Sequence, residues 1–598
     1  MQLLLAQTRR AARLQWACSP TRCISKVAAR ATTKALHKLP DTPARTRFAP
    51  SPTGFLHLGS LRTALFSYLL AKSTGGQFIL RLEDTDQKRT IPGAEERIKE
   101  DLKWAGLQWD EGPDVEGPYG PYKQSERLWI YREYAEKLLE TNKAYRCFCP
   151  KEMLAKEAGD VQGGIHTPPG INPHDCPHIS KETSNSRVSQ GQSHVVRLRL
   201  GDHLPGYKDM VYGKVPSMKT GHAQDTILLK SDGWPTYHLA CVVDDHLMKI
   251  THVIRGTEWT PSTPFHFMIY EAFGWTPPVF GHVGLLTNVH GEKFSKRKAD
   301  IDLSSFQKRG VLPDALANFV ALLGWSHTGK EDFMTPQQLI ENFSTKFTKG
   351  DVKVQFDKLW FLQRKHAIEA ITKASSPKDL ERDMINPLIE VLKTMDTPLV
   401  DGATEKDLKE TLFRLMKADM RNWTNVEEFA ARHHRTLVAP TENELRAQES
   451  SIVLSGHLSH RDAMKNFVPL QVPNKDIVEI VRQLPALLDK HVDMPVDERF
   501  LKLNADFLDV LAPVVEKQIA GLAQPLGETD AYSLNKSWVA MVHKYLKWAV
   551  VLNTPGPDVL RLMLVLGKEE SMRRLELAEK VALEAGKAAL ETSQSTLW

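Results

Sequence analysis

Long apolar runs are missing from this sequence of 598 residues, and cysteine is scarce. No stretch approaches the ~20 consecutive apolar residues that a helix needs to cross a membrane, so we expect no membrane span. Only six cysteines are present, and in a reducing compartment we expect thiols or metal ligands rather than disulfides. The remainder, 41% apolar and 25% charged, is ordinary for a soluble chain with several domains and a large core.

Acidic residues are missing from residues 1–40, while Ser, Thr and Ala are frequent there. The basic residues in this range are Arg9, Arg10, Arg13, Arg22, Lys26, Arg30, Lys34 and Lys38. This composition is typical of a mitochondrial transit peptide, so we expect the protein to work in the mitochondrial matrix. A basic tail that helps to bind RNA is the alternative. Without these eight charges the formal net charge falls from +5 to about −3 (5 − 8), so nucleic-acid binding must rely on local basic patches.

The most informative stretch is residues 46–82. Residues 46–49 are predicted to form a strand, and the leucines of residues 58–69 recur at helical spacing after a loop with two prolines and two glycines. Gly75 and Gly76 end that helix, and residues 77–82 read as the next strand, which completes a βαβ unit. The amino end of such a helix can bind phosphate, and His57 and Ser51 can add side-chain donors. An ordinary turn with one exposed histidine is the alternative.

A second candidate phosphate site lies at residues 291–298. Three lysines and one arginine surround Ser295 in a loop led by glycine, which suits a mobile clamp on a polyphosphate, although a solvated basic loop is the alternative. The two stretches together resemble the HIGH and KMSKS signatures of class I aminoacyl-tRNA synthetases. The forms APSPTGFLHLG and KFSKR, with LRLEDTD between them, resemble glutamyl-tRNA synthetases of the bacterial and organellar kind. The resemblance is strong from Arg45 to Trp325 and thinner as far as Leu575.

This resemblance implies an α/β fold, with a Rossmann-like class I catalytic domain that carries an inserted acceptor-stem-binding domain and is followed by an all-α anticodon-binding region. The expected boundaries are 1–40 for the transit peptide, 41–108 for the first half of the catalytic domain, 109–218 for the insertion, 219–300 for the second half with the KMSKS-type loop, 301–372 for a helical stem-contact region, and 373–598 for the helical anticodon-binding region.

The resemblance also implies the reaction. L-Glutamate is activated by ATP, accompanied by Mg²⁺, to glutamyl-adenylate, and is then joined to the 3′-terminal adenosine of tRNA(Glu). Such chemistry depends on positioning and on stabilising charge at phosphate oxygens. The catalytic candidates are His57, Lys296 and Lys293. The ATP-binding candidates are His57, Gly59, Glu258, Trp259, Leu286, Lys293, Phe294, Ser295, Lys296 and Arg297.

Choosing glutamate over glutamine requires a fixed positive charge at the side-chain carboxylate, which an arginine fork supplies. The resemblance favours Arg255 for this role with support from Arg47, and it assigns the substrate ammonium to Glu83. Cys241 departs from the bacterial pattern, which has Asn at that position. No role is assigned to the acidic pair at residues 244–245. The glutamate-binding candidates are Arg47, Ala49, Ser51, Glu83, Tyr237, Cys241 and Arg255.

Three cysteines and one histidine form a candidate metal site. Cys147-x-Cys149 and Cys176-x-His178 offer three thiolates and one imidazole, a tetrahedral set suited to structural Zn²⁺. The segment between the two pairs is polar and loop-like, where a metal can replace a missing core. Some bacterial relatives have zinc at similar spacing, and others, including organellar ones, lack a full set. Unpaired thiols and a surface histidine are the alternative.

Competing functions remain open at this point. Glutaminyl-tRNA synthetase shares the architecture, but its signatures typically contain Glu-Pro-Asn and Met-Ser-Lys, where this chain has Ser-Pro-Thr and Phe-Ser-Lys. A non-catalytic tRNA-binding protein on the same fold is disfavoured by the intact His57, Lys296 and Arg255. The sequence does not decide whether tRNA(Gln) is charged in addition to tRNA(Glu). We expect a monomer.

Overall fold

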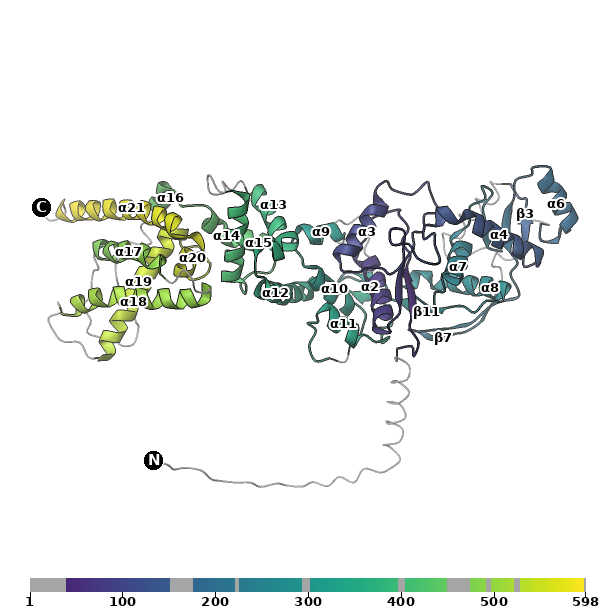
Figure 1. Cartoon of the computed structure of the whole chain (residues 1–598), viewed down its shortest axis with the longest axis horizontal. Coiled ribbons are helices and arrows are strands. Elements are labelled where there is room, and N and C mark those ends of the chain that lie inside the picture. Colours follow the sequence, from purple (N-terminus) through teal and green to yellow (C-terminus); the bar gives the residue numbers. More distant parts are fainter. Residues whose placement is uncertain are drawn as a thin grey trace, which may run out of the picture. The chain divides into compact units, whose positions relative to one another are not determined.

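The computed structural model describes residues 39–150, 176–220, 225–292, 302–327, 329–395, 404–448, 474–490, 496–520 and 528–595. The chain divides into two compact units (Figure 1). Unit 1 comprises Met1–Asp302 and Ala317–Gln355, and unit 2 comprises Leu303–Leu316 and Phe356–Trp598. Unit 1 is α/β and the described part of unit 2 is helical, which confirms the expected fold class.

A six-stranded sheet in the order β2-β1-β10-β11-β6-β7 forms the framework of unit 1. All neighbouring strands are parallel except β6 and β7, which pair antiparallel. The carboxyl ends of the five parallel strands therefore meet at one edge, where open α/β sheets bind their ligands. The strands are β1 (Arg45–Phe48), β2 (Gln77–Leu80), β6 (Tyr207–Asp209), β7 (Gly213–Val215), β10 (His252–Gly256) and β11 (Val279–Val283).

The first crossover is the predicted βαβ unit, with β1 and β2 joined through α2 (Leu58–Ser73). Helix α2 buries its leucines against the sheet, as their spacing predicts. Gly75 has a φ of 66°, and a Cβ added to Gly76 would lie 2.0 Å from the carbonyl oxygen of Ala44. Glycine is therefore required where the chain turns from α2 into β2.

A smaller antiparallel sheet in the order β3-β4-β9 packs with α4 (Leu128–Glu140), α7 (Tyr237–Leu247) and α8 (Thr263–Phe273) around a shared hydrophobic core. Its strands are β3 (Ala144–Cys147), β4 (Val195–Leu198) and β9 (Ile227–Leu229). Asp244 of α7 accepts hydrogen bonds from Gln124, Arg127 and Tyr131 at 2.8, 2.7 and 2.8 Å. Because Asp244 is fully buried, these bonds fix α7 against α4 and the turn before it.

The other elements of unit 1 are short. They are α3 (Ala94–Trp104), η1 (Gln124–Arg127), η2 (Cys176–His178), α6 (Lys181–Ser189), β5 (His203–Leu204), β8 (Met218–Lys219), η3 (Thr257–Ser262), β12 (Leu286–Thr287), α11 (Pro336–Asn342) and β13 (Val352–Lys353). Helix α10 (Pro313–Leu322) spans the boundary between the units.

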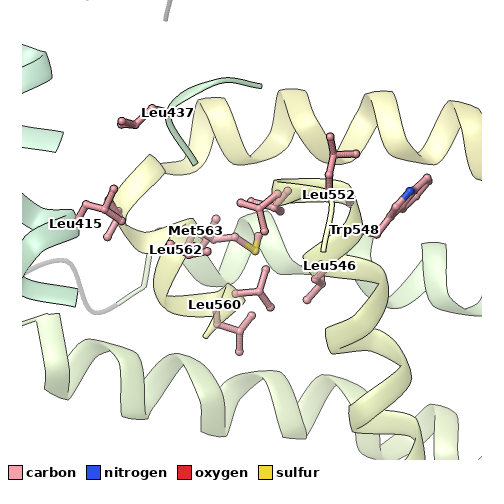
Figure 2. Packing of buried hydrophobic residues seen from close by; sticks show 14 of the residues in the cluster. Leu415, Leu437, Leu546, Trp548, Leu552, Leu560, Leu562 and Met563 are labelled. Carbon is pink, nitrogen blue, oxygen red and sulfur yellow. The ribbon is translucent and has the colours of Figure 1, made fainter. Parts of the chain in front are cut away.

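Unit 2 packs its helices around a large apolar core that includes the fully buried Trp423, Trp538 and Trp548. Figure 2 shows part of this core, where Leu560, Leu562 and Met563 of α20 gather with neighbouring apolar side chains. Among the described helices, none is long and apolar enough to cross a membrane. The elements are α9 (Leu303–Lys308), α12 (Phe356–Lys373), η5 (Pro377–Leu380), η6 (Glu381–Ile385), α13 (Asn386–Thr394), α14 (Glu405–Asp419), α15 (Val426–Leu437), α16 (Glu442–Ala447), α17 (Asn474–Leu488), α18 (Val496–Ala520), α19 (Glu528–Val551), α20 (Val559–Leu566) and α21 (Lys568–Ser595).

Candidate active site

Most of the predicted substrate residues line one cavity at the carboxyl edge of the six-stranded sheet. Its volume of about 380 Å³ lies within the usual range for small-molecule sites. The predicted residues that line it are Arg47, Ala49, Ser51, His57, Gly59, Glu83, Tyr237, Arg255, Glu258, Trp259 and Leu286. The predicted residues of the second signature, Lys293, Phe294, Ser295, Lys296 and Arg297, lie outside the described residues.

His57 caps the amino end of α2 with its own ring. Its Nδ1 accepts hydrogen bonds from the backbone N–H groups of Gly59 and Ser60 at 3.1 and 3.2 Å, and Ser60 Oγ accepts one from the His57 N–H at 2.9 Å. This capping box assigns the ring proton to Nε2. His57 can therefore donate from Nε2 toward a phosphate, while the positive end of the α2 dipole faces the same cavity.

Two arginines share one buried carboxylate beside the cavity. Arg47 Nε and Arg81 Nη1 donate to Asp245 Oδ1 at 3.2 and 2.7 Å, and Arg81 Nη2 donates to Glu83 Oε1 at 2.9 Å. Burial acts to raise the pKa of Asp245, but Arg47 and Arg81 together lower it below its ordinary value. For Glu83 burial prevails and raises the pKa, although both arginines oppose it. An ammonium group beside Glu83 would favour its ionised form.

Cys241 contacts this network and does not line the cavity. Its Sγ lies 3.7 Å from Nη2 of both Arg47 and Arg81, and 3.6 Å from Asp245 Oδ2. Burial, with the negative charges of Asp245 and Glu83, raises the pKa of Cys241 to about 12, so it stays a thiol. Sequence reasoning missed Arg81 and Asp245 as parts of the site. The available signal was the four-residue spacing of Cys241 and Asp245, which puts both on one face of α7.

Arg255, at the end of β10, has neutral partners. Its Nη1 donates to Tyr237 Oη at 3.0 Å, and its Nη2 donates to Thr263 Oγ1 at 2.7 Å and to the Trp259 carbonyl at 3.4 Å. Its Nε donates to His282 Nε2 at 3.1 Å. Among the described residues no carboxylate forms an ion pair with Arg255. Its charge is therefore available to a ligand, whereas the charge of Arg47 is shared with Asp245.

Arg62 is a further buried cation that the sequence did not single out. It lies on α2, lines the cavity and is 2% exposed. Its Nη2 donates to the Gly284 carbonyl and its Nη1 to the Leu323 carbonyl at 3.3 Å. Burial lowers the pKa of Arg62 to about 10. Arg62 thus fastens the start of α2 to the segments that follow β11 and α10.

Three of the four candidate metal ligands lie together. The thiols of Cys147, Cys149 and Cys176 have their sulfur atoms within 4.8 Å of one another, and Cys149 and Cys176 are 3.8 Å apart. The Phe148 N–H donates to Cys176 Sγ at 3.4 Å. His178 follows in η2 but is not part of this group. The arrangement provides three soft ligands for one cation.

The fold is that of a class I aminoacyl-tRNA synthetase catalytic domain. Residues 43–361 match the family described as tRNA synthetases class I (E and Q), catalytic domain.

Within this class, the relatives that match the chain include several glutamate–tRNA ligases. The chain is 45% identical over 399 residues to the mitochondrial glutamate–tRNA ligase of Saccharomyces cerevisiae. This alignment covers 63% of this chain and 72% of the yeast protein. It is 50% identical over 333 residues to the Schizosaccharomyces pombe mitochondrial enzyme, covering 55% of this chain and 62% of that protein. The glutamate–tRNA ligase of Chloroherpeton thalassium is 35% identical over 544 residues, covering 89% of this chain and 97% of the relative.

Among solved structures, a glutamate tRNA ligase from Elizabethkingia meningosepticum in complex with its amino acid aligns with a TM-score of 0.66 and 29% identity, covering 90% of this chain and 99% of that one. This chain belongs to the glutamyl-tRNA synthetase family.

Proposed function

We propose that this protein is a glutamate–tRNA ligase, which forms glutamyl-adenylate from L-glutamate and ATP and transfers the glutamyl group to the 3′-terminal adenosine of tRNA(Glu). The observation that carries the proposal is the charge distribution of the cavity. Arg255 has no acidic partner among the described residues, while Arg47 is paired with Asp245. An arginine whose charge no described carboxylate offsets suits a ligand with a carboxylate better than its neutral amide.

Each part of the substrate has a matching group. Arg255 binds the γ-carboxylate, and Glu83, which also lines the cavity, binds the ammonium. The rings of Tyr237 and Trp259 lie 4.6 Å apart and form an aromatic wall. Trp259 and Leu286 face the adenine by family resemblance.

Activation places the substrate α-carboxylate in line with the α-phosphorus of ATP, and pyrophosphate leaves. His57 Nε2 and the N–H groups at the start of α2 stabilise charge on the phosphate oxygens. Lys293 and Lys296 pair with the leaving pyrophosphate, and Mg²⁺ enters with ATP rather than in a protein cage.

The proposed location is the mitochondrial matrix, supported by the basic, acid-free composition of residues 1–40 and by the similarity to the mitochondrial glutamate–tRNA ligases of two yeasts. We expect a monomer that charges tRNA(Glu) and leave tRNA(Gln) as the second substrate to test. Aminoacylation of each purified tRNA by the full chain decides this, because each product is measured separately.

We also propose structural zinc at Cys147, Cys149 and Cys176, with His178 as fourth ligand. The three sulfurs within 4.8 Å of one another fit a thiolate-rich zinc site. Bound zinc would hold β3 to η2 and so stabilise the region expected to meet the tRNA acceptor end. The test is metal content of the purified protein with a matched thiol titration. One zinc per chain, lost in Cys149→Ser, supports the site, and a metal-free protein in which Cys147, Cys149 and Cys176 all react as thiols overturns it.

Pyrophosphate exchange tests the enzyme assignment. We expect exchange with glutamate, dependent on tRNA, and little with glutamine. Glutamine-dependent exchange would indicate a glutaminyl-tRNA synthetase, and no exchange would indicate a non-catalytic tRNA-binding protein.

Two variants of His57 test its role in the same assay. His57→Asn keeps a good helix cap but removes the Nε2 donor, so the rate should fall by about 10²–10³ with α2 intact. His57→Ala removes both the helix cap and the Nε2 donor. A normal rate in His57→Asn would remove His57 from the chemistry.

A further inference from the structure

A row of buried polar side chains crosses three neighbouring strands behind the cavity. Arg255 on β10 and His282 on β11 are register partners, and Asp209 ends the next strand, β6. Arg255 Nε donates to His282 Nε2 at 3.1 Å, and His282 Nδ1 lies 2.6 Å from Asp209 Oδ2. The three residues are 5%, 1% and 2% exposed.

The bonding pattern determines where the His282 proton lies. An arginine can only donate, so the Nε2 that faces Arg255 must accept, and the proton must lie on Nδ1, where Asp209 accepts it. Burial lowers the pKa of His282 although Asp209 opposes this, which agrees with a neutral ring. Thr263 Oγ1, 3.0 Å from the same Nε2, also receives an N–H from Arg255.

Asp209 is itself held in one orientation. Its Oδ1 accepts from the backbone N–H groups of Val211 and Tyr212, both at 2.8 Å, and its Oδ2 accepts from the His282 N–H at 3.2 Å. All of these neighbours are donors. The carboxylate therefore cannot be replaced by an amide without placing an NH₂ group against an N–H.

Arg255 is thereby oriented without being neutralised. Asp245 contacts Arg47 directly, but a neutral imidazole separates Asp209 from Arg255. In Arg255 the Nε hydrogen is bonded to His282, one Nη1 hydrogen to Tyr237, and the Nη2 group to Thr263 and the Trp259 carbonyl. One Nη1 hydrogen is left for a ligand among the described residues, on a side chain that lines the cavity.

We infer that His282 and Asp209 are positioning residues that set the preference for glutamate, by holding the Nε edge of Arg255 so that its Nη1 edge and its full charge face the γ-carboxylate. The inference rests on the proposed function of Arg255. Neither residue touches the substrate, so their effect should appear in glutamate recognition and not in ATP binding.

Asp209→Asn is the decisive variant, because it has the same shape. If the amide oxygen takes the Oδ1 position, the NH₂ group faces His282 Nδ1, which must then accept a hydrogen bond. The ring proton therefore moves to Nε2, where it points at the Nε–H of Arg255. We expect KM for glutamate in tRNA-dependent pyrophosphate exchange by the full chain to rise about 10- to 100-fold, as for loss of a buried hydrogen bond to a charged group. KM for ATP should stay unchanged, and the rate ratio of glutamate to glutamine should fall.

Two substitutions of His282 separate orientation from packing. His282→Phe keeps a ring but cannot accept from Arg255, and it should match Asp209→Asn. His282→Gln places an amide oxygen near the Nε2 position, so it should retain part of the glutamate affinity that His282→Phe loses.

The matched control is another buried Asp–His pair, Asp419 and His433, whose atoms lie 2.9 Å apart in unit 2. Asp419→Asn should lower thermal stability without moving KM for glutamate. The inference is overturned if Asp209→Asn raises KM for glutamate and ATP equally, or raises neither, while Arg255→Gln still impairs glutamate use. If Arg255→Gln also has no effect, the proposed role of Arg255 fails instead. If His282→Phe does not fold, Asp209→Asn and His282→Gln decide the result.

Discussion

Replacing Arg255 by Gln tests whether one guanidinium selects the side chain of the substrate. The change removes a positive charge and the hydrogen bonds to His282, Tyr237 and Thr263, but leaves no carboxylate unpaired. Arg47→Gln is the matched comparison. Arg47→Gln also removes one positive charge from the cavity. In contrast to Arg255→Gln, it leaves a buried carboxylate, Asp245, with only one of its two arginine partners, Arg81.

The two variants should change different properties. A hydrogen bond to a charged group contributes about 1.5–3 kcal/mol, so Arg255→Gln should lower kcat/KM for glutamate by about 10- to 150-fold. Removing one partner of a buried ion pair costs about 3–5 kcal/mol of unfolding free energy, so Arg47→Gln should be the less stable variant, at the lower end of that range because Arg81 keeps Asp245 paired.

The assay is tRNA-dependent pyrophosphate exchange with glutamate, glutamine and ATP varied in turn, combined with thermal melting. Arg382→Gln controls for loss of an arginine in general, since that side chain is 71% exposed. We expect Arg255→Gln to lose preference for glutamate over glutamine at an unchanged KM for ATP. Unchanged glutamate kinetics in Arg255→Gln would refute the reasoning, whatever happens to stability.

Three further outcomes are expected. Lys296→Ala should raise the activation barrier by about 3 kcal/mol with little change in tRNA affinity, because its target is the nucleotide's phosphates; equal losses in exchange rate and in tRNA binding would count against this role. Burial lowers the pKa of His366 to about 4 from 6.5, so the folded state binds fewer protons than the unfolded chain within that window and stability falls as pH falls through it. His366→Gln should flatten the dependence of Tm on pH between 6.5 and 4. In this window the native histidine lowers the unfolding free energy by up to about 3 kcal/mol, at about 1.4 kcal/mol per pKa unit. An unaltered slope would contradict the lowered pKa of His366. Leu562 is 1% exposed (Figure 2), so Leu562→Ala should lower the unfolding free energy measured by calorimetry by about 2–5 kcal/mol. Leu501 is 67% exposed, so Leu501→Ala should change the unfolding free energy little. Similar losses in both variants would contradict the burial of Leu562 in the core.

The first βαβ unit and its helix cap region were predictable because their signals are local. The leucine spacing, the glycines at 75 and 76, and the loop before α2 each act within a few residues. The capping role of His57 Nδ1 was not predicted, because histidine is an uncommon cap and the loop conformation decides which nitrogen faces the backbone.

The metal ligands show where sequence spacing stops being informative. Two pairs with equal spacing predicted four ligands, but the structure groups only Cys147, Cys149 and Cys176. In an extended pair such as Cys147 and Cys149 the side chains are set by the end of β3, whereas the direction of His178 depends on the short turn η2. The fourth ligand therefore stays a prediction.

By itself the sequence determined the family, because the loop with His57, the basic loop around Lys296 and the segment with Glu83 together form its signatures, although each stretch alone has another interpretation. Only the tertiary structure decided how Arg47 and Arg255 differ, the first paired with a carboxylate and the second held by neutral partners. Arg47 is bonded to Asp245, which lies 198 residues away in the sequence. Arg255 is bonded to His282, 27 residues away, and His282 is bonded to Asp209, 73 residues away. The physical reason is that charge compensation depends on which side chains strand order and register bring within hydrogen-bond distance, and no local pattern in the chain encodes those distances.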